Sequence, residues 1–254
     1  MDLLLLGFLA LFAGFIDAVV GGGGLIQLPA LFGLYPQTLP AMLLGTNKAA
    51  SIAGTAVAAT RYLRRIRLSW RTLAPAVAGA LLFAFLGARA VAWLPRDAVR
   101  PLILGLLVAV AIYTFARHDF GRVHAPRLPR AWEPWAGFAT GAVLGFYDGF
   151  FGPGTGSFLI FVFVRFFGWD LLIASASAKV VNVATNFTAL AFFAATGNVL
   201  WLTALVMAGC NIAGSWLGAE MALAHGTGFV RRIFLLVLVV LIGKFGWDTV
   251  APWF

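Results

Sequence analysis

Long apolar runs separated by short polar or glycine-rich breaks fill most of this chain. Runs close to the roughly 20 residues that cross about 30 Å of hydrocarbon occur at 3–20, 40–60, 72–94, 99–116, 133–151, 171–195, 200–223 and 229–250. Two shorter apolar stretches, 25–34 and 157–167, each follow a glycine-rich break, and as helices they would reach only about 15 Å. The pattern predicts an all-α integral membrane protein with eight long transmembrane helices and two short half-helices.

The second half of the chain repeats the first at a constant shift of 131 residues. Rare residue types keep this register, and the aligned pairs include Asp17 and Asp148, Lys48 and Lys179, and Trp70 and Trp201. A chance similarity of apolar composition would not keep them aligned. We therefore predict a first transmembrane repeat at 1–116, a basic linker at 117–132 and a second transmembrane repeat at 133–254.

The distribution of arginine favours one topology. If only the eight long segments cross, nine arginines lie on the side of the linker and six lie opposite; if the short segments cross as well, the division is twelve to three. Arginine-rich loops tend to be cytoplasmic, so the second arrangement is preferred. It makes the repeats inverted, with loops 61–71 and 117–132 in the cytoplasm and both termini outside. The alternative is two parallel four-helix units with re-entrant short segments.

Composition supports the membrane class and narrows the function. Of the residues 62% are hydrophobic and 11% charged, and mean hydropathy is +0.96, values far from those of soluble domains. The net charge of +9 comes mainly from fifteen arginines, most of them between apolar runs, which indicates a bilayer surface instead of nucleic acid. We interpret the apolar start as part of the fold and not as a signal peptide, because it lacks a basic leader and contains Asp17.

Few residues could support catalysis or metal binding. Cys210 is the single cysteine, and the sequence has neither a Walker lysine–serine motif nor H-E-x-x-H. These features predict no enzyme activity, no cofactor and no metal site.

Lysine occurs only at Lys48, Lys179 and Lys244. Lys48 lies eight residues after Pro40, so about 12 Å into its helix, and Lys179 takes the equivalent place. A charge at the bilayer centre costs about 2.5–3.5 kcal/mol, so both side chains should face the interior and have a partner or a function. Lys244 has no polar neighbours of this kind and is expected to extend to a surface.

Polar side chains accompany the two interior lysines. Each lysine is followed at i+3 and i+7 by polar residues that share its helix face; these are Ser51, Thr55, Asn182 and Asn186, and Asn47 precedes Lys48. Two interpretations stay open: an anion site, or two structural ion pairs in which Lys48 pairs with Asp17 and Lys179 with Asp148.

The glycine-rich breaks at 21–24 and 152–156 precede the short apolar segments. A helix that begins after such a loop directs free N–H groups and its positive dipole end at whatever lies there, and glycine lets a ligand approach the backbone. The candidate contacts are Gly22, Gly23, Gly154, Thr155 and Gly156. The structural alternative is a tight turn between packed helices.

Four motifs give the chain a family resemblance: GFIDAVVGGGG at 14–24, LGTNKAASIAGT at 44–55, GFYDGFFGPGTGSF at 145–158 and SASAKVVNVATNFTAL at 175–190. Over nearly its whole length the chain resembles the sulfite exporter TauE/SafE family of bacterial inner-membrane permeases. The resemblance implies a multi-pass secondary carrier for a small anion, especially sulfite or an organosulfonate.

These observations lead to one mechanistic hypothesis: alternating access of two inverted halves around a central anion site. In it Lys48 and Lys179 supply charge, and Asp17 and Asp148 either fix the lysines or carry coupling protons. A second copy of the chain, in a homo-oligomer, is the further partner that we consider. The alternatives are an anion channel and a non-transporting membrane assembly factor.

Overall fold

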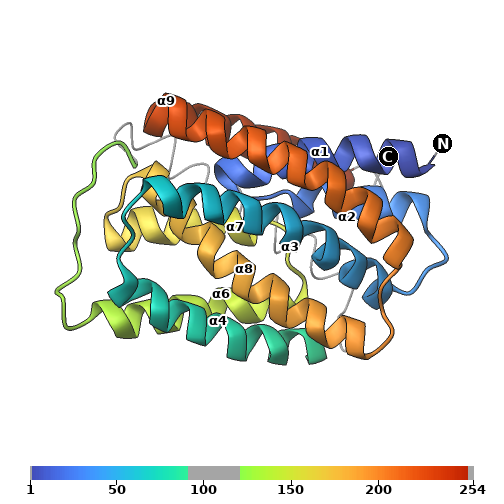
Figure 1. Cartoon of the computed structure of the whole chain (residues 1–254), viewed down its shortest axis with the longest axis horizontal. Coiled ribbons are helices and arrows are strands. Elements are labelled where there is room, and N and C mark those ends of the chain that lie inside the picture. The colour runs from blue at the N-terminus through green and yellow to red at the C-terminus, as the bar shows by residue number, and fades with distance from the viewer. Residues whose placement is uncertain (1, 91–120, 251–254) are drawn as a thin grey trace.

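A computed structural model describes residues 2–90 and 121–250, with side chains over 3–90 and 121–240. Within these ranges the chain is helical and contains no strand (Figure 1). The elements are α1 (Asp2–Val20), α2 (Gly24–Leu34), α3 (Pro40–Arg65), α4 (Trp70–Ala90), α6 (Glu133–Phe150), α7 (Thr155–Val162), the π-helical segment η2 (Phe163–Phe167), α8 (Leu171–Ala195) and α9 (Trp201–Val250).

The helices follow the predicted apolar segments wherever the structure describes them. Segments 3–20, 40–60, 72–94, 133–151 and 171–195 fall on α1, α3, α4, α6 and α8. α9 combines the last two segments, 200–223 and 229–250. Its backbone leaves the helical region at Gly226 (φ 67°, ψ −163°), which lies between the two segments. The predicted segment 99–116 lies outside the described residues.

Four described helices are long and apolar enough to cross a membrane: α1 over Leu3–Val20, α4, α8, and α9 over Trp201–Val240. α3 has 26 residues but is not among them. It carries Lys48 and a series of polar residues, several of which it buries inside the bundle. The count of eight spans and the topology stay predictions.

The two short segments form short helices, as expected. α2 has 11 residues, and α7 has 8 residues before the five-residue η2. At 1.5 Å per residue α2 extends only about 16 Å. Gly154 precedes α7 with φ +83°, a left-handed backbone conformation that glycine adopts without strain. The break therefore lets the chain turn sharply and begin a new helix inside the bundle.

Helices from the two halves of the chain pack against each other. α1 runs along α9, and α4 runs along α6 (Figure 1). Glycines allow the close approach: a Cβ at Gly218 would crowd the Phe15 carbonyl oxygen, and a Cβ at Gly87 would overlap that of Phe146. These two contacts are equivalent under the 131-residue shift. Each pair therefore joins the first helix of one half to a late helix of the other.

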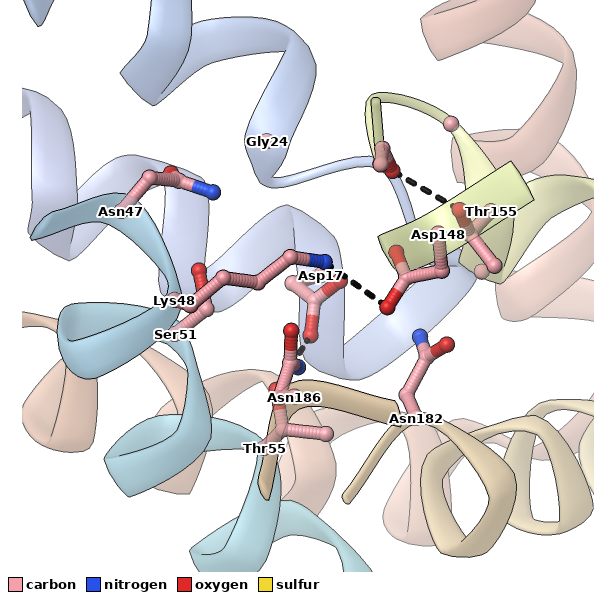
Figure 2. A pocket seen from close by; sticks show the side chains of 14 residues that line it. Asp17, Gly24, Asn47, Lys48, Ser51, Thr55, Asp148, Thr155, Asn182 and Asn186 are labelled. Atoms are coloured by element: carbon pink, nitrogen blue, oxygen red, sulfur yellow. Dashed lines mark hydrogen bonds and ion pairs between the residues drawn. The ribbon is translucent and has the colours of Figure 1, made fainter. Parts of the chain in front are cut away.

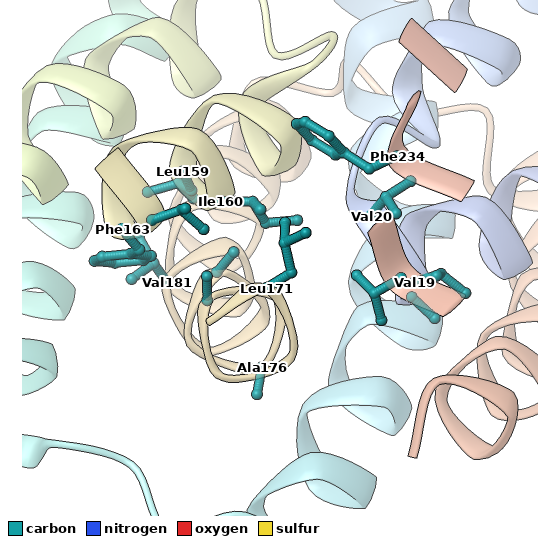
Figure 3. Packing of buried hydrophobic residues seen from close by; sticks show 14 of the residues in the cluster. Val19, Val20, Leu159, Ile160, Phe163, Leu171, Ala176, Val181 and Phe234 are labelled. Atoms are coloured by element: carbon teal, nitrogen blue, oxygen red, sulfur yellow. The ribbon is translucent and has the colours of Figure 1, made fainter. Parts of the chain in front are cut away.

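A buried apolar cluster fixes the short helix α7 at the centre. In Figure 3 side chains from four parts of the chain meet there, namely the end of α1, α7 with η2, α8 and the later part of α9. The labelled members are Val19, Val20, Leu159, Ile160, Phe163, Leu171, Ala176, Val181 and Phe234. Their contacts hold the glycine break before α7 against the end of α1.

Candidate functional site

The two glycine-rich breaks cross at the centre of the bundle. Gly21 follows α1, and Gly156 lies in the first turn of α7; a Cβ on either would overlap the backbone of the other. Gly21 also has φ +70°, which side chains rarely tolerate. The crossing brings together two loops that lie far apart in the sequence.

Hydroxyl groups satisfy the backbone where α1 ends. The last carbonyl groups of a helix have no partner within it, and here side chains of α3, α7 and α8 donate to them. The bonds are Tyr62 Oη to Ala18 O (2.9 Å), Ser175 Oγ to Val19 O (2.7 Å), and Ser157 Oγ to Val20 O (3.1 Å) and Gly21 O (3.0 Å). Tyr62 and Ser157 were not among the sequence candidates. Tyr62 lies in the arginine-rich segment and Ser157 opens the short apolar stretch 157–167, so neither pattern points to the end of α1.

A polar cavity of about 30 Å³ lies beside the crossing (Figure 2). It has room for about two waters. The residues that line it are Asp17, Gly22, Gly24, Asn47, Lys48, Ser51, Thr55, Asp148, Gly152, Gly154, Thr155, Gly156, Asn182 and Asn186. The structure thus brings together the polar residues of α3 and α8, two aspartates and both glycine breaks.

Each buried lysine pairs with the aspartate of the other half. Lys48 Nζ lies 2.7 Å from Asp148 Oδ2, and Lys179 Nζ lies 3.0 Å from Asp17 Oδ2. The ion pairs expected from the sequence, Lys48 with Asp17 and Lys179 with Asp148, are therefore wrong. The physical reason is the packing of α1 and α6 in the bundle, which presents each aspartate to the lysine helix of the opposite half.

Comparison with known proteins identifies the family of the chain. The family model for the sulfite exporter TauE/SafE matches residues 6–245. The chain belongs to the TauE/SafE family. It is 34% identical over 249 residues to the probable membrane transporter protein YfcA of Escherichia coli K12, covering 97% of this chain and 91% of the relative. A probable membrane transporter protein of Haemophilus influenzae is also 34% identical, over 242 residues, covering 95% and 92%.

A third relative, the probable membrane transporter protein ORF9 of a Sinorhizobium species, is 34% identical over 234 residues, covering 91% of this chain and 87% of the relative. No solved structure matches the chain significantly. TauE/SafE proteins are transporters and not enzymes, and this chain is a multi-pass membrane protein of that family. Among the described residues no group of three or more His, Cys, Asp or Glu side chains could hold a metal ion.

The two lysines of this TauE/SafE chain occupy different positions relative to the cavity. Lys48 lines it, although only 3% of the residue is exposed, whereas Lys179 is fully buried and is not part of the wall. Asp17 lies on the wall and contacts Lys179, and it also accepts a hydrogen bond from Thr55 Oγ1 at 3.2 Å. The equivalence that the repeat predicts for the two lysines is therefore not preserved in their surroundings.

The glycines of the two breaks also differ in whether they line the cavity. Gly24 and Gly152 line the cavity although the sequence did not single them out, and Gly23 does not line it. A Cβ at Gly23 would crowd Ala13 O and Asp17 Cβ, so this glycine serves the packing of the break on α1. The side chain of Lys244 lies outside the described residues.

Several polar atoms around the cavity have no partner within the described residues. They include the side-chain oxygens of Asn47 and Asn182. Burying a polar atom without a hydrogen bond is costly. The NH₂ group of each amide lies near a glycine that lines the cavity, Gly24 for Asn47 and Gly156 for Asn182. Both amides can therefore donate to a polar ligand there, beside an ammonium group that offers three N–H donors.

Proposed function

We propose that the chain is a secondary transporter that moves a small anion, sulfite or an organosulfonate, across the bacterial cytoplasmic membrane. The observation that carries the proposal is Lys48, a buried ammonium on the wall of a polar cavity between two crossing helix breaks. A buried charge is expensive in a bilayer and marks a functional position by default. The TauE/SafE family name supplies the substrate class.

The donors around the cavity suit an oxyanion. Lys48 provides charge, and Asn47 and Asn182 provide amide groups. The Thr155 hydroxyl, which lies on the same wall, already donates to Gly152 O at 2.8 Å. The short helices α2 and α7 both begin at the cavity, where their positive dipole ends favour negative charge. Broken helices directed at a substrate in this way are a recurrent device of secondary transporters.

Alternating access fits the packing of the bundle. The contacts Gly218–Phe15 and Gly87–Phe146 are equivalent under the repeat shift, which supports two intertwined halves related by an approximate two-fold axis. A cavity with room for about two waters is small for an organosulfonate, so we expect the helix breaks to move apart when such an anion binds. We assign that movement to α2 and α7, because these are the short elements that begin at the cavity.

Lys48→Met tests the proposal directly. Methionine keeps an unbranched stem and removes the charge, so the variant should lose sulfite binding in calorimetric titration and saturable sulfite flux in liposomes. Arg64→Met is the matched control, because Arg64 is an exposed basic residue at the end of the same helix. Wild-type uptake by the Lys48→Met protein would contradict the anion site.

The same flux assay separates the alternatives. A channel would give flux that rises linearly with sulfite concentration and does not saturate. An assembly factor would give neither binding nor flux of any small anion. Saturable flux that requires Lys48 is the result expected of a carrier.

A further inference from the structure

The two ion pairs at the cavity differ in how firmly each carboxylate is held. Asp17 contacts Lys179 at 3.0 Å and accepts a hydrogen bond from Thr55 Oγ1 at 3.2 Å. Asp148 contacts Lys48 at 2.7 Å, and within the described residues its Oδ2 has no hydrogen-bond partner besides that ion pair. If Lys48 turned to another anion, the Asp148 carboxylate would lose its counter-charge.

The cavity gives an anion access to one pair only. Lys48 and Asp148 both line it and are drawn facing each other across it in Figure 2. Lys179 is fully buried and does not line it. An anion that enters the cavity can therefore compete with Asp148 for the Lys48 ammonium. It cannot reach Lys179 in the same way, because the Asp17 carboxylate lies between the cavity and that lysine.

The charges at the site balance before any anion arrives. Two lysines and two aspartates carry no net charge together. A monovalent anion at Lys48 adds one negative charge to a buried site, and the displaced carboxylate then lies unpaired in a medium that solvates it poorly. A proton on that carboxylate restores neutrality.

We propose that Asp148 takes up one proton each time an anion binds at Lys48, so that the protein co-transports a proton with its anion. This inference rests on the proposed anion transport. The proton comes from the water on the side where the anion enters and binds a carboxylate oxygen of Asp148. Lys48 keeps its own protons. On the opposite side the anion and the proton leave, and the 2.7 Å pair forms again.

The other titratable groups near Asp148 already have interaction partners. Asp17 and Lys179 neutralise each other at 3.0 Å. Tyr147, the neighbour of Asp148 on α6, donates its hydroxyl to Pro153 O at 2.6 Å. Among the described residues that face the cavity, Asp148 is thus the carboxylate that an anion would leave without a partner.

Proton uptake can be counted with purified full-length protein. Methanesulfonate is the probe, because its charge does not change over about pH 5–8, the range to be tested. Calorimetric titrations in two buffers with different ionisation enthalpies should report about one proton bound per anion. By linkage, affinity should then fall about tenfold for each unit that the pH rises.

Two carboxylate variants assign the proton to its residue. Asp148→Asn is already neutral, so it should bind methanesulfonate with an affinity that does not change with pH and without proton uptake. Asp170→Asn, which changes a carboxylate that caps α8 and does not line the cavity, should keep both the pH dependence and the proton count. If Asp148→Asn does not fold, the proton count of the wild-type protein still decides whether coupling occurs.

Liposomes reconstituted with the protein supply the transport arm. An acidic exterior should drive methanesulfonate to accumulate inside, and an internal pH dye should show protons entering with it. Anion binding with no proton uptake and no pH dependence would overturn the coupling and leave the transport proposal intact. Failure of both methanesulfonate and sulfite to bind would overturn the proposed function, and the coupling with it.

Discussion

We predict that Lys48→Met lowers the stability of the protein. A second substitution should restore stability only at the aspartate that pairs with Lys48. The substitution leaves Asp148, which is 4% exposed, without its counter-charge. Breaking a buried ion pair by removing one partner costs about 3–5 kcal/mol. Because the abandoned carboxylate can take up a proton, we expect the lower end of that range, about 3 kcal/mol.

Because each lysine pairs with the aspartate of the other half (the crossed pairing), the two possible double variants should differ in stability. Lys48→Met with Asp148→Asn removes both charges of one pair, so most of the loss should be recovered, with a coupling energy of about 2 kcal/mol. Lys48→Met with Asp17→Asn breaks both pairs and leaves Asp148 and Lys179 unpaired. That double variant should therefore be no more stable than Lys48→Met alone.

Thermal unfolding in detergent, followed by the fluorescence of the nine tryptophans, measures these differences. For a chain of this size about 3 kcal/mol corresponds to a fall in Tm of about 6–12 °C. Arg64→Met, which removes an exposed charge from the same helix, should shift Tm by no more than a degree or two, because exposed substitutions change stability by only about 0.5 kcal/mol. Rescue of Lys48→Met by Asp17→Asn and not by Asp148→Asn would refute the crossed pairing.

Three further predictions concern the crossing of the breaks and the topology. Gly156→Ala places a Cβ into the opposing glycine loop and should lower the free energy of unfolding by about 1–3 kcal/mol. The variant should show a lower Tm and a poorer yield of monodisperse protein. At the control position Gly209 a Cβ meets open space, so Gly209→Ala should leave stability unchanged. Ser157→Ala removes the hydroxyl that donates to two carbonyl groups at the end of α1 and should lower the free energy of unfolding by about 1–3 kcal/mol; a Tm equal to that of the wild type would contradict this role. In a Cys210→Ser background, a cysteine at the exposed linker position Val123 should react with a membrane-impermeant maleimide only after the cells are opened, and labelling of intact cells would refute the cytoplasmic linker.

Local patterns in the sequence determined the membrane class, the short helices after the glycine breaks and the polar faces around the lysines. These features depend on residues close together in the chain. The spacing of Lys48, Ser51 and Thr55, for example, places them on one face of a helix wherever that helix lies, and all three line the cavity.

Only the tertiary structure decided which charges meet. Lys48 and Asp148 are 100 residues apart in the sequence. The 131-residue shift indicates that the two halves are equivalent, but it contains no information about how they pack against each other. Whether α1 and α6 present their aspartates to their own half or to the other depends on helix packing, and that packing follows from glycine contacts such as Gly218 against Phe15. For the same reason the sequence treated the two lysines as equal. In the folded bundle Lys48 lines the cavity while Lys179 lies fully buried outside its wall, because a side chain's access to a cavity is set by all the elements around it and not by its own helix.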